Sequence, residues 1–359
     1  MKIVLAALNA KYVHSNLAVY DLQAYAEEQL NKERNELYKT EKAGIPEIVI
    51  KEYTINHNLD LILQSLYQEK AAVVAFSCYI WNITMIMELV TELHKLLPQV
   101  PVWLGGPEVT YDAPKLLEKY PGVTGIMVGE GEETFAELLE YYVKKEVTKQ
   151  LSDIPGLVLQ NGPTVPREPL SMDKIPFLYS NLDDFKNRII YYESQRGCPF
   201  RCSYCLSSID KSVRLRDISV VKNELQFFLE NQVEQVKFVD RTFNCNHKHA
   251  MEIWQYLHSH DQGITNFHFE VAADLLNEEE LSLIEKMRPG LIQLEIGVQS
   301  TNENTIREIR RTMKFSEVAR IVKRIMGSGN VHQHLDLIAG LPYEDLQSFQ
   351  KSFDDVYGL

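Results

Sequence analysis

The chain has 359 residues, with 37 Lys and Arg against 50 Asp and Glu, which gives a formal net charge of −13. Hydrophobic residues make up 45% and charged residues 24%, so wholesale disorder is excluded and about two domains are expected. No apolar run approaches the ~18 residues of a membrane helix, and the N-terminus turns polar too early for a signal peptide. We therefore expect a cytoplasmic protein with no membrane partner, and the acidic charge disfavours nucleic acid as a partner.

Residues 1–145 alternate short apolar runs with amphipathic stretches. The apolar runs predict buried strands at Ile3–Leu8, Glu47–Tyr53, Ala72–Tyr79, Val102–Gly105 and Gly125–Gly129. Helices are predicted between them, for example at Ile83–Leu97 and Thr134–Val143. Strands that alternate with helices indicate a parallel sheet covered on both faces. We therefore expect a doubly wound, flavodoxin-like α/β domain that binds ligands at the carboxyl ends of its strands.

A second array of strands and helices is predicted in residues 189–359. Before it, residues 146–188 are rich in Pro and Gly, and we predict a linker with a hairpin that pairs Gly156–Gln160 with Val165. The second array has predicted strands at Ile189–Gln195, Gln235–Asp240, Phe267–Ala272, Leu291–Val298 and His332–Ile338. Its predicted helices are Val220–Asn231, Lys248–Ser259, Glu278–Met287, Glu303–Ile309 and Phe315–Gly327. The order indicates a partial barrel, which we expect to be truncated after its fifth strand and to come from a longer protein.

Three of the five cysteines lie in one short motif, GCPFRCSYC, with the spacing C-x3-C-x2-C. Three thiolates on one tight loop can bind three irons of a cubane cluster and leave the fourth iron open to a small ligand. Tyr204 precedes the last cysteine and is expected to shield the cluster from water. A zinc loop is the alternative, but structural zinc needs a fourth ligand, and the nearest spare thiol, Cys245, lies 40 residues further along the chain.

The cysteine motif, placed after the first strand of a barrel-like array, resembles the signature of the radical S-adenosylmethionine (SAM) enzymes. The resemblance runs from Tyr191 to the C-terminus. It implies that Cys198, Cys202 and Cys205 hold a 4Fe–4S cluster whose open iron is chelated by SAM. It also implies that one electron from the cluster cleaves SAM to methionine and a 5′-deoxyadenosyl radical. A reductant such as flavodoxin or ferredoxin would then be a partner.

The same resemblance suggests residues that contact SAM. Asp240 follows the second strand, where the family meets the SAM amino group, although the usual Gly-Gly-Glu form is absent. Glu270, Glu295 and Gln299 lie near the carboxyl ends of the third and fourth strands, in positions suited to the ribose or the methionyl end. Arg311, with Arg310 as the alternative, resembles an arginine that meets the SAM carboxylate. Ile338 and Gly340 match a fifth-strand motif that packs against adenine, and Tyr204 completes the SAM-binding set.

The turns after the strands of the first domain resemble those of the cobalamin-binding domain that precedes the radical SAM core in one large subclass. A Gly-Gly pair at a strand end permits close approach by a large flat ligand. The candidate cobalamin-binding residues are Asn9, Tyr12, Ser15, Ser77, Trp81, Gly105, Gly106, Glu108, Gly129 and Glu130. The Asp-x-His-x-x-Gly motif of cobalt-ligating domains is absent around His14, so we expect cobalamin without a protein imidazole beneath the cobalt.

Together these resemblances predict a cobalamin-dependent radical SAM enzyme that transfers a methyl group to, or rearranges, an unknown small molecule. One alternative is a radical SAM enzyme that has lost cobalamin. Another is a non-catalytic sensor module that binds a cluster or a corrinoid. A transfer-RNA methylthiotransferase is disfavoured, because that group has three further cysteines in its N-terminal domain and only Cys78 is present here.

Overall fold

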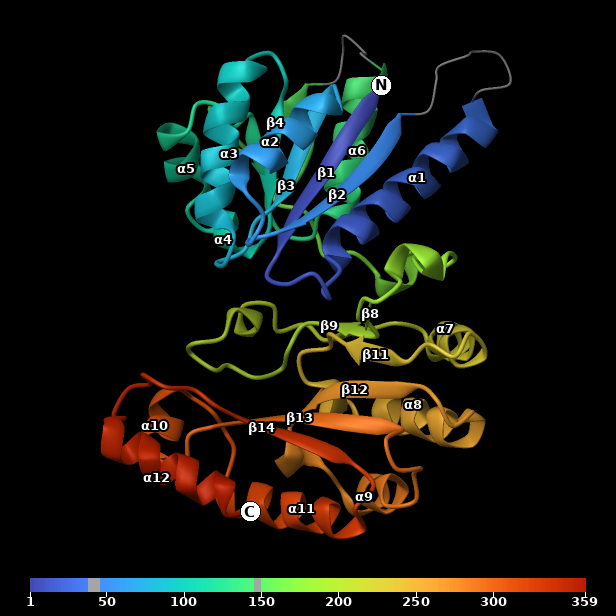
Figure 1. Ribbon diagram of the computed structural model, residues 1–359, viewed down its shortest axis with the longest axis vertical. Helices are drawn as coiled ribbons and strands as arrows, with labels where there is room; N and C mark the ends of the chain where they lie inside the picture. The colour runs from blue at the N-terminus through green and yellow to red at the C-terminus, as the bar shows by residue number, and fades with distance from the viewer. Residues whose placement is uncertain (38–45, 145–149) are drawn as a thin grey trace. The chain divides into compact units, whose positions relative to one another are not determined.

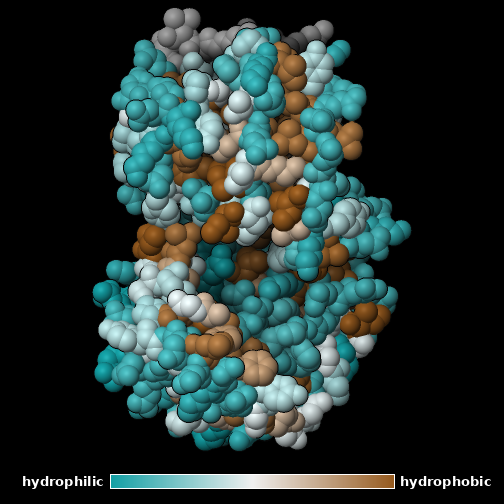
Figure 2. Space-filling model, turned by 60° about the vertical axis from the view of Figure 1, so that its left-hand side comes forward, coloured by the Kyte–Doolittle hydropathy of each residue, from teal (hydrophilic) through white to brown (hydrophobic). Residues whose placement is uncertain are grey.

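The computed structural model describes residues 1–37, 46–144 and 150–359. The chain divides into two compact units, Met1–Arg188 and Ile189–Leu359 (Figure 1). On the face shown in Figure 2, apolar residues at the surface are interspersed among hydrophilic ones. None of the described helices is both long enough and apolar enough to cross a membrane.

The first unit is built on a seven-stranded sheet in the order β2-β1-β3-β4-β5-β6-β7. Its strands are β1 (Lys2–Asn9), β2 (Glu47–Thr54), β3 (Val73–Ser77), β4 (Val102–Gly105), β5 (Gly125–Met127), β6 (Leu157–Leu159) and β7 (Gly162–Pro163). Its helices are α1 (Leu17–Leu37), α2 (Leu59–Gln68), α3 (Ile83–Leu96), α4 (Pro107–Thr110), α5 (Ala113–Lys119) and α6 (Glu132–Lys144). Strands β1 to β5 run parallel in the flavodoxin-like order, which confirms the predicted fold class of this unit.

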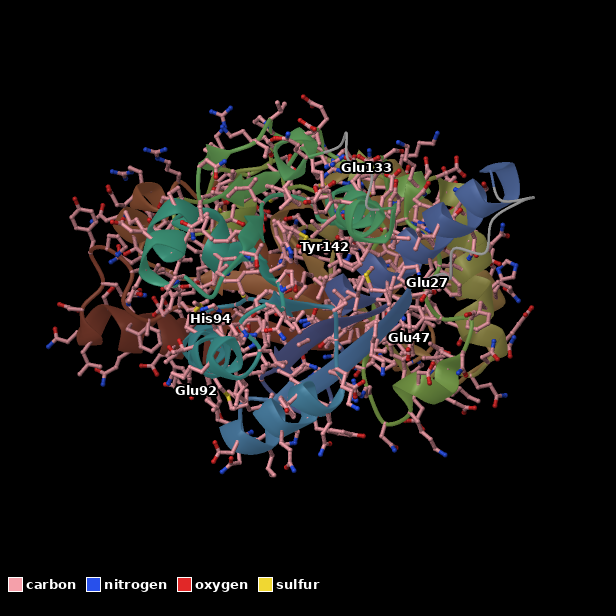
Figure 3. The ribbon with its side chains drawn as sticks, turned by 90° about the horizontal axis from the view of Figure 1, so that it is seen from above. Glu27, Glu47, Glu92, His94, Glu133 and Tyr142 are labelled. Atoms are coloured by element: carbon pink, nitrogen blue, oxygen red, sulfur yellow. The ribbon has the colours of Figure 1, made fainter. Side chains whose placement is uncertain are left out.

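Helices cover both faces of this sheet, which explains why its strands are apolar without alternation. Ile3 and Leu5 of β1 pack with α1 and α6, whereas Val4 and Leu8 pack with α2 and α3 on the opposite face (Figure 1). The buried Trp103 of β4 donates a hydrogen bond from Nε1 to the hydroxyl of Tyr142, 3.0 Å away on α6. Tyr142 is labelled on this helix in Figure 3. The sheet is therefore a rigid platform for the turns at its carboxyl edge.

The Pro-rich segment packs on the first unit. Its predicted hairpin forms β6 and β7, and it extends the sheet because β6 pairs antiparallel with β5. Arg167 donates to Glu137 of α6 over 2.9 Å, and the backbone N–H of Leu170 donates to the Glu130 carboxylate over 2.7 Å. The described part of this segment is thus tied to the domain that precedes it, while the expected start of the linker at residues 146–149 lies outside the described residues.

The second unit contains a parallel five-stranded sheet in the order β14-β13-β12-β11-β8 and a small antiparallel pair, β9 and β10. Its strands are β8 (Ile190–Tyr192), β9 (Gln195–Arg196), β10 (Arg214–Leu215), β11 (Gln235–Phe238), β12 (Asn266–Val271), β13 (Ile292–Gln299) and β14 (His332–Leu337). Its helices are α7 (Ile218–Glu230), α8 (His247–His260), α9 (Glu278–Ile284), α10 (Glu303–Glu308), α11 (Phe315–Ser328) and α12 (Leu346–Tyr357). The predicted first strand is divided between β8 and β9, because the chain turns at Ser194 toward the cysteine motif.

The two faces of the second sheet differ in polarity, because one carries aromatic side chains and the other carries polar ones. Phe238 and Phe269 belong to the outer face, where the ring of Phe269 lies 5.9 Å from that of Trp254 on α8. The alternate positions carry polar side chains, among them Lys237, His268, Glu270, Glu295 and Asp336. The interior of a closed (βα)8 barrel is normally filled by branched apolar residues, so a polar inner face indicates a ligand-binding lumen.

Gly106 provides a test of the turn at the carboxyl end of β4. It has φ +117°, and a Cβ there would lie 2.4 Å from the carbonyl oxygen of Cys78, whereas Gly162 has nearly the same φ, +120°, with no atom within 4 Å. We expect Gly162→Ala to lower the free energy of unfolding by about 1–3 kcal/mol, because alanine is strained at this positive φ. Gly106→Ala should lower the free energy of unfolding distinctly more, because the backbone at Cys78, directly after β3, must also move. Urea unfolding of the two variants measures this, and equal losses would contradict the close approach.

Candidate functional site

The cysteine motif forms a loop that is closed at its base. Strands β9 and β10 pair antiparallel on either side of it, with Arg196 opposite Arg214. Gly197 has φ +91°, and a Cβ there would lie 2.2 Å from the backbone oxygen of Ser212, so only glycine fits this crossing of the chain. The backbone N–H of Cys198 donates to the carbonyl of Asp210 over 3.1 Å. The motif glycine therefore allows the loop to fold back on itself.

All three cysteines of the motif line one cavity of about 230 Å³ in the second unit. The other lining residues are Phe200, Tyr204, Ser207, Arg241, Thr242, Glu270, Val271, Ala272, Asp274, Glu295, Gly297, Gln299, Arg311, Thr312, Met313 and Asp336. Cys198 and Cys202 are almost completely buried, and Cys205 is half-buried. The structure thus brings the thiols together with groups from β12, β13 and β14 on the inner face of the sheet.

The fourth cysteine of this unit, Cys245, lies outside the cavity wall. Its sulfur is 3.8 Å from Oε1 of Gln195, whose amide nitrogen donates to the carbonyl of Thr242 over 2.8 Å. Burial raises the pKa of the Cys245 thiol. Within the described ranges, no three His, Cys, Asp or Glu side chains, the motif cysteines included, are arranged to share a single metal ion. Cys245 therefore adds no thiol to the set of three.

Two of the side chains that line the cavity each have one buried polar atom without a hydrogen-bond partner. Nη2 of Arg311 donates to the carbonyl of Gly297, and Nη1 lies 3.4 Å from the hydroxyl of Tyr204. Nε of Arg311 and Oε1 of Gln299 are buried without a hydrogen bond. A Cβ on Gly297 would lie 2.3 Å from Nε2 of Gln299, so the glycine makes room for that side chain. Buried polar atoms are normally hydrogen-bonded, so the unpartnered donor of Arg311 and the unpartnered acceptor of Gln299 in one cavity indicate a binding site for a polar ligand.

Three carboxyl groups line the cavity on the neighbouring strands. His268 and Lys237 lower the pKa of Glu295 to about 2, although burial acts in the opposite direction. Burial, and then the charge of Glu295, raise the pKa of both Glu270 and Asp336. At neutral pH Glu295 is therefore ionised, and Glu270 and Asp336 hold protons more readily than ordinary carboxyl groups do.

The predicted SAM-binding residues divide into two groups. Those that line the cavity are Tyr204, Glu270, Glu295, Gln299 and Arg311. Ile338 and Gly340 lie outside it, after the end of β14, where Gly340 is exposed with φ +88° and the N–H of Ile338 donates to the carbonyl of Gln299. Arg310, the alternative arginine, is also absent from the wall. The structure thus favours Arg311 over Arg310 as the arginine that faces a ligand.

Asp240 differs from the prediction. Its carboxylate is fully buried and does not line the cavity. It accepts hydrogen bonds from the N–H and hydroxyl of Ser194, over 2.8 and 2.5 Å, and from the N–H of Gln195. Asp240 therefore holds the turn that leads into the cysteine loop. The same turn is contacted by His249 of α8, which is buried with Nε2 3.4 Å from the Ser194 hydroxyl.

Several cavity residues were not predicted from the sequence. Arg241 and Thr242 directly follow Asp240, beyond the end of β11, where the alternation of a strand no longer says which side chain points inward. The hydroxyl of Thr242 lies 3.7 Å from the sulfur of Cys198. Asp336 could have been found, because it shares one face of β14 with His334 and is paired in register with Gly297.

In the first unit, the candidate cobalamin residues lie at the carboxyl edge of the sheet. Tyr12, Trp81 and Glu108 are exposed, and Trp81 stacks on Tyr79 with ring centroids 4.4 Å apart. Gly129 has φ +80° and no atom within 4 Å of a Cβ position, so its backbone is open to close approach. Gly105 ends β4, and Gly106 caps the start of α4 at the same edge.

Other members of that set have internal partners instead. Asn9 donates to the carbonyl of His14 and to Glu52, over 2.9 and 2.8 Å, and Ser77 lies 3.3 Å from the amide nitrogen of Asn16. Ser15 is buried. Glu130 accepts from the N–H of Leu170, so it anchors the Pro-rich segment, which differs from its predicted role as a ligand contact.

Two family models match the chain, one for each unit. The model described as B12 binding domain matches residues 4–139, and the model described as Radical SAM superfamily matches residues 192–356. The first match contains β2 to β5 and most of β1, and the second contains β9 to β14; β6, β7 and most of β8 lie outside the matched ranges.

Curated relatives and solved structures agree with these matches. TokK of Streptomyces tokunonensis, described as a cobalamin-dependent radical SAM methyltransferase, is 26% identical over 303 residues, covering 77% of this chain and 44% of TokK. A 2-(S-pantetheinyl)-carbapenam-3-carboxylate methyltransferase of Streptantibioticus cattleyicolor is 26% identical over 306 residues, with the same coverage. The cobalamin-dependent radical enzyme OxsB, solved with aqua-cobalamin and SAM, has a TM-score of 0.77 at 16% identity, covering 99% of this chain and 51% of OxsB.

The methyltransferase TsrM of Kitasatospora setae, solved with cobalamin and a 4Fe–4S cluster, has a TM-score of 0.73 at 16% identity and covers 99% of this chain and 70% of TsrM. Because both structures are only 16% identical to this chain, the similarity establishes a shared fold and nothing beyond it. The chain spans 44% of the length of the curated relatives TokK and the carbapenam methyltransferase.

Asp240 gives a test of the turn before the cysteine loop. Burial raises its pKa to about 7, so between about pH 4 and pH 7 the folded chain holds a proton that the unfolded chain has lost. This contribution to stability therefore falls as the pH rises through that range. Asp240→Asn keeps an acceptor for both backbone N–H groups and should remove this part of the pH dependence in urea unfolding at pH 5 and 7.5. An unchanged pH dependence in the variant would contradict the assignment.

Proposed function

The chain belongs to the radical SAM enzymes that carry a B12-binding domain, and on this premise we propose that it uses a 4Fe–4S cluster to cleave SAM reductively and to drive a cobalamin-dependent methyl transfer. The observation that carries the proposal is that three thiols line one polar cavity together with Arg311, whose Nε has no hydrogen-bond partner.

The three thiols fit a cluster with one open iron. Cys198, Cys202 and Cys205 line the same wall, and the closed loop between β9 and β10 fixes their backbone. Cys245 does not line this wall, and its sulfur lies 3.8 Å from Oε1 of Gln195, so the cavity offers three thiols. Three thiolate ligands suit a cubane that offers its fourth iron to an exchangeable ligand.

The groups opposite the cysteines fit the polar parts of SAM. Arg311 has a buried donor without a partner and is held in place by the carbonyl of Gly297, which suits a carboxylate ligand. Gln299 offers an unpartnered acceptor, and Glu295 offers an ionised one. When bound, the cluster and SAM supply one-electron cleavage of the sulfonium to methionine and a 5′-deoxyadenosyl radical.

The remaining cavity residues would orient the ligand and keep water away from it. Phe200, Met313 and Val271 supply apolar wall between the polar groups. Tyr204 is hydrogen-bonded to Arg311 over 3.4 Å, so the aromatic ring beside the cysteines is tied to the arginine that faces the ligand. Exclusion of water protects a reactive radical from side reactions.

The carboxyl edge of the first unit fits a large flat ring. Tyr12 and Trp81 expose aromatic surface there, and Gly129 leaves its backbone open. Such a surface suits a corrin, and relatives whose names include cobalamin support its presence. We therefore propose cobalamin as a second cofactor, without a protein imidazole on its cobalt.

Methyl transfer is the proposed reaction, because the curated relatives TokK and the carbapenam enzyme are both named methyltransferases. The substrate is proposed to be a small molecule, and the electron donor to be a small reductant such as flavodoxin or ferredoxin. A second candidate is a radical SAM enzyme without cobalamin, favoured by the internal partners of Asn9, Ser77 and Glu130. Corrinoid absorbance after reconstitution of the chain separates the two.

The cluster assignment is tested with cysteine variants. After anaerobic reconstitution we expect about four irons per chain in the wild type and in Cys245→Ala, and formation of 5′-deoxyadenosine when reductant and SAM are added. The triple variant Cys198→Ala, Cys202→Ala, Cys205→Ala should lose nearly all iron and all product. Iron retained by the triple variant would refute the assignment, and cluster-loaded wild type that never cleaves SAM would favour the sensor alternative.

A further inference from the structure

The cysteine loop has an inner and an outer side, and the proposed function uses only the inner one. Phe200, Tyr204 and Ser207 line the cavity together with the cysteines. Leu206 and Ile209 do not line it, and their side chains are 48% and 59% exposed. The loop therefore presents apolar surface to solvent outside the cavity.

The outer side also carries two basic side chains without an ion-pair partner. Arg201 and Lys211 are exposed, lie outside the cavity wall and form no ion pair with any part of the chain that the structure describes. Arg214 is instead paired with Asp210 over 3.2 Å, and this pair neutralises the one acidic residue of the segment 197–213. The positive charge on the outer side therefore comes from Arg201 and Lys211.

The charge of this segment is opposite to that of the whole chain. Residues 196–216 contain five basic residues and one acidic residue, whereas the chain has a net charge of −13. An acidic protein is repelled by the net charge of the chain and attracted by this segment, so charge steers it to one place. The exposed apolar side chains supply the contact that the core of an interface needs. The outer loop surface consists of four exposed side chains, Arg201, Leu206, Ile209 and Lys211.

The most exposed cysteine of the motif lies beside this surface. Cys198 and Cys202 are each 7% exposed, whereas Cys205 is half-buried. Cys205 directly precedes the turn Leu206–Ser208, and its carbonyl accepts a hydrogen bond from the hydroxyl of Ser208 over 2.7 Å. An electron that arrives at the outer loop surface therefore has a short covalent path to a thiol of the cluster site.

We propose that the outer loop surface is the docking site for an acidic electron-carrier protein of the flavodoxin or ferredoxin kind, an inference that rests on the proposed function. In this complex one electron leaves the carrier, which is oxidised, and enters the cluster, which is reduced. No atom or proton is transferred in this step. The attraction depends on exposed charges, so the complex weakens as the salt concentration rises.

The first test measures binding of flavodoxin to the cluster-loaded chain by isothermal titration calorimetry under anaerobic conditions. We expect the double variant Arg201→Gln, Lys211→Gln to raise the dissociation constant roughly tenfold at low salt, because both attractive charges are lost. Lys211→Arg should bind as the wild type does. High salt should remove most of the difference between the wild type and the double variant.

A matched control removes the same charge elsewhere in the second unit. Lys286, after α9, and Lys323, on α11, are exposed and form no ion pair within the described ranges. The double variant Lys286→Gln, Lys323→Gln should bind flavodoxin as the wild type does. Equal weakening in both double variants would mean that only the total charge matters, and would overturn the proposal. Unchanged binding in Arg201→Gln, Lys211→Gln would also overturn it.

The second test separates docking from the chemistry of the cluster. Formation of 5′-deoxyadenosine is measured with reduced flavodoxin and, separately, with dithionite, a small reductant that needs no docking surface. The variant Arg201→Gln, Lys211→Gln should slow the reaction driven by flavodoxin and leave the reaction driven by dithionite unchanged, since neither residue lines the cavity. Equal slowing with both reductants would indicate a structural effect and overturn the proposal.

A single variant keeps the proposal testable if the double variant does not load its cluster. Lys211 lies outside the cysteine motif, so Lys211→Gln then decides the question. Flavodoxin binding that is unchanged in Lys211→Gln would overturn the proposal, and weaker binding that salt abolishes would support it.

These outcomes are distinct from failure of the proposed function. If the cluster-loaded wild type forms no 5′-deoxyadenosine even with dithionite, the proposed function fails. If dithionite supports the reaction but neither flavodoxin nor a ferredoxin binds the wild type, only the docking surface fails.

Discussion

The closure of one short loop is the constraint on which the site depends. Gly197 lets the chain pass within contact distance of Ser212, and the β9–β10 pair then fixes the ends of the segment that carries Cys198, Cys202 and Cys205. Asp240 supports the same loop from behind, because it accepts hydrogen bonds from the turn at Ser194. A side chain at position 197 would separate the two arms of the loop and with them the thiols.

The second feature is the polar inner face of the sheet that receives this loop. Its outer face is packed with aromatic residues such as Phe238 and Phe269, which provide the hydrophobic stabilisation of the unit. The inner face can therefore carry charged and amide groups at modest cost, provided that each is paired or meets a ligand. Lys237 pairs with Glu295, whereas Nε of Arg311 and Oε1 of Gln299 are left unsatisfied beside the cysteines.

Much of the fold could be predicted from the sequence, because buried parallel strands leave continuous apolar runs and the cysteine spacing is specific. The strands at Val102–Gly105 and Gly125–Met127 follow from such runs. The side chains beyond strand ends could not be predicted in the same way. Arg241, and not Asp240, lines the cavity, because alternation along β11 ends before these residues. Glu130 anchors the Pro-rich segment through Leu170, a contact between distant residues that no local pattern reveals.

The most direct test of the account is the electron paramagnetic resonance spectrum of the reduced, cluster-loaded chain, recorded with and without SAM. If three cysteines leave one iron open in the cavity beside Arg311, addition of SAM must change the g-values, because its amino and carboxylate groups become iron ligands. A cluster signal that stays the same at saturating SAM would mean that no iron is open to the ligand, and would contradict the account.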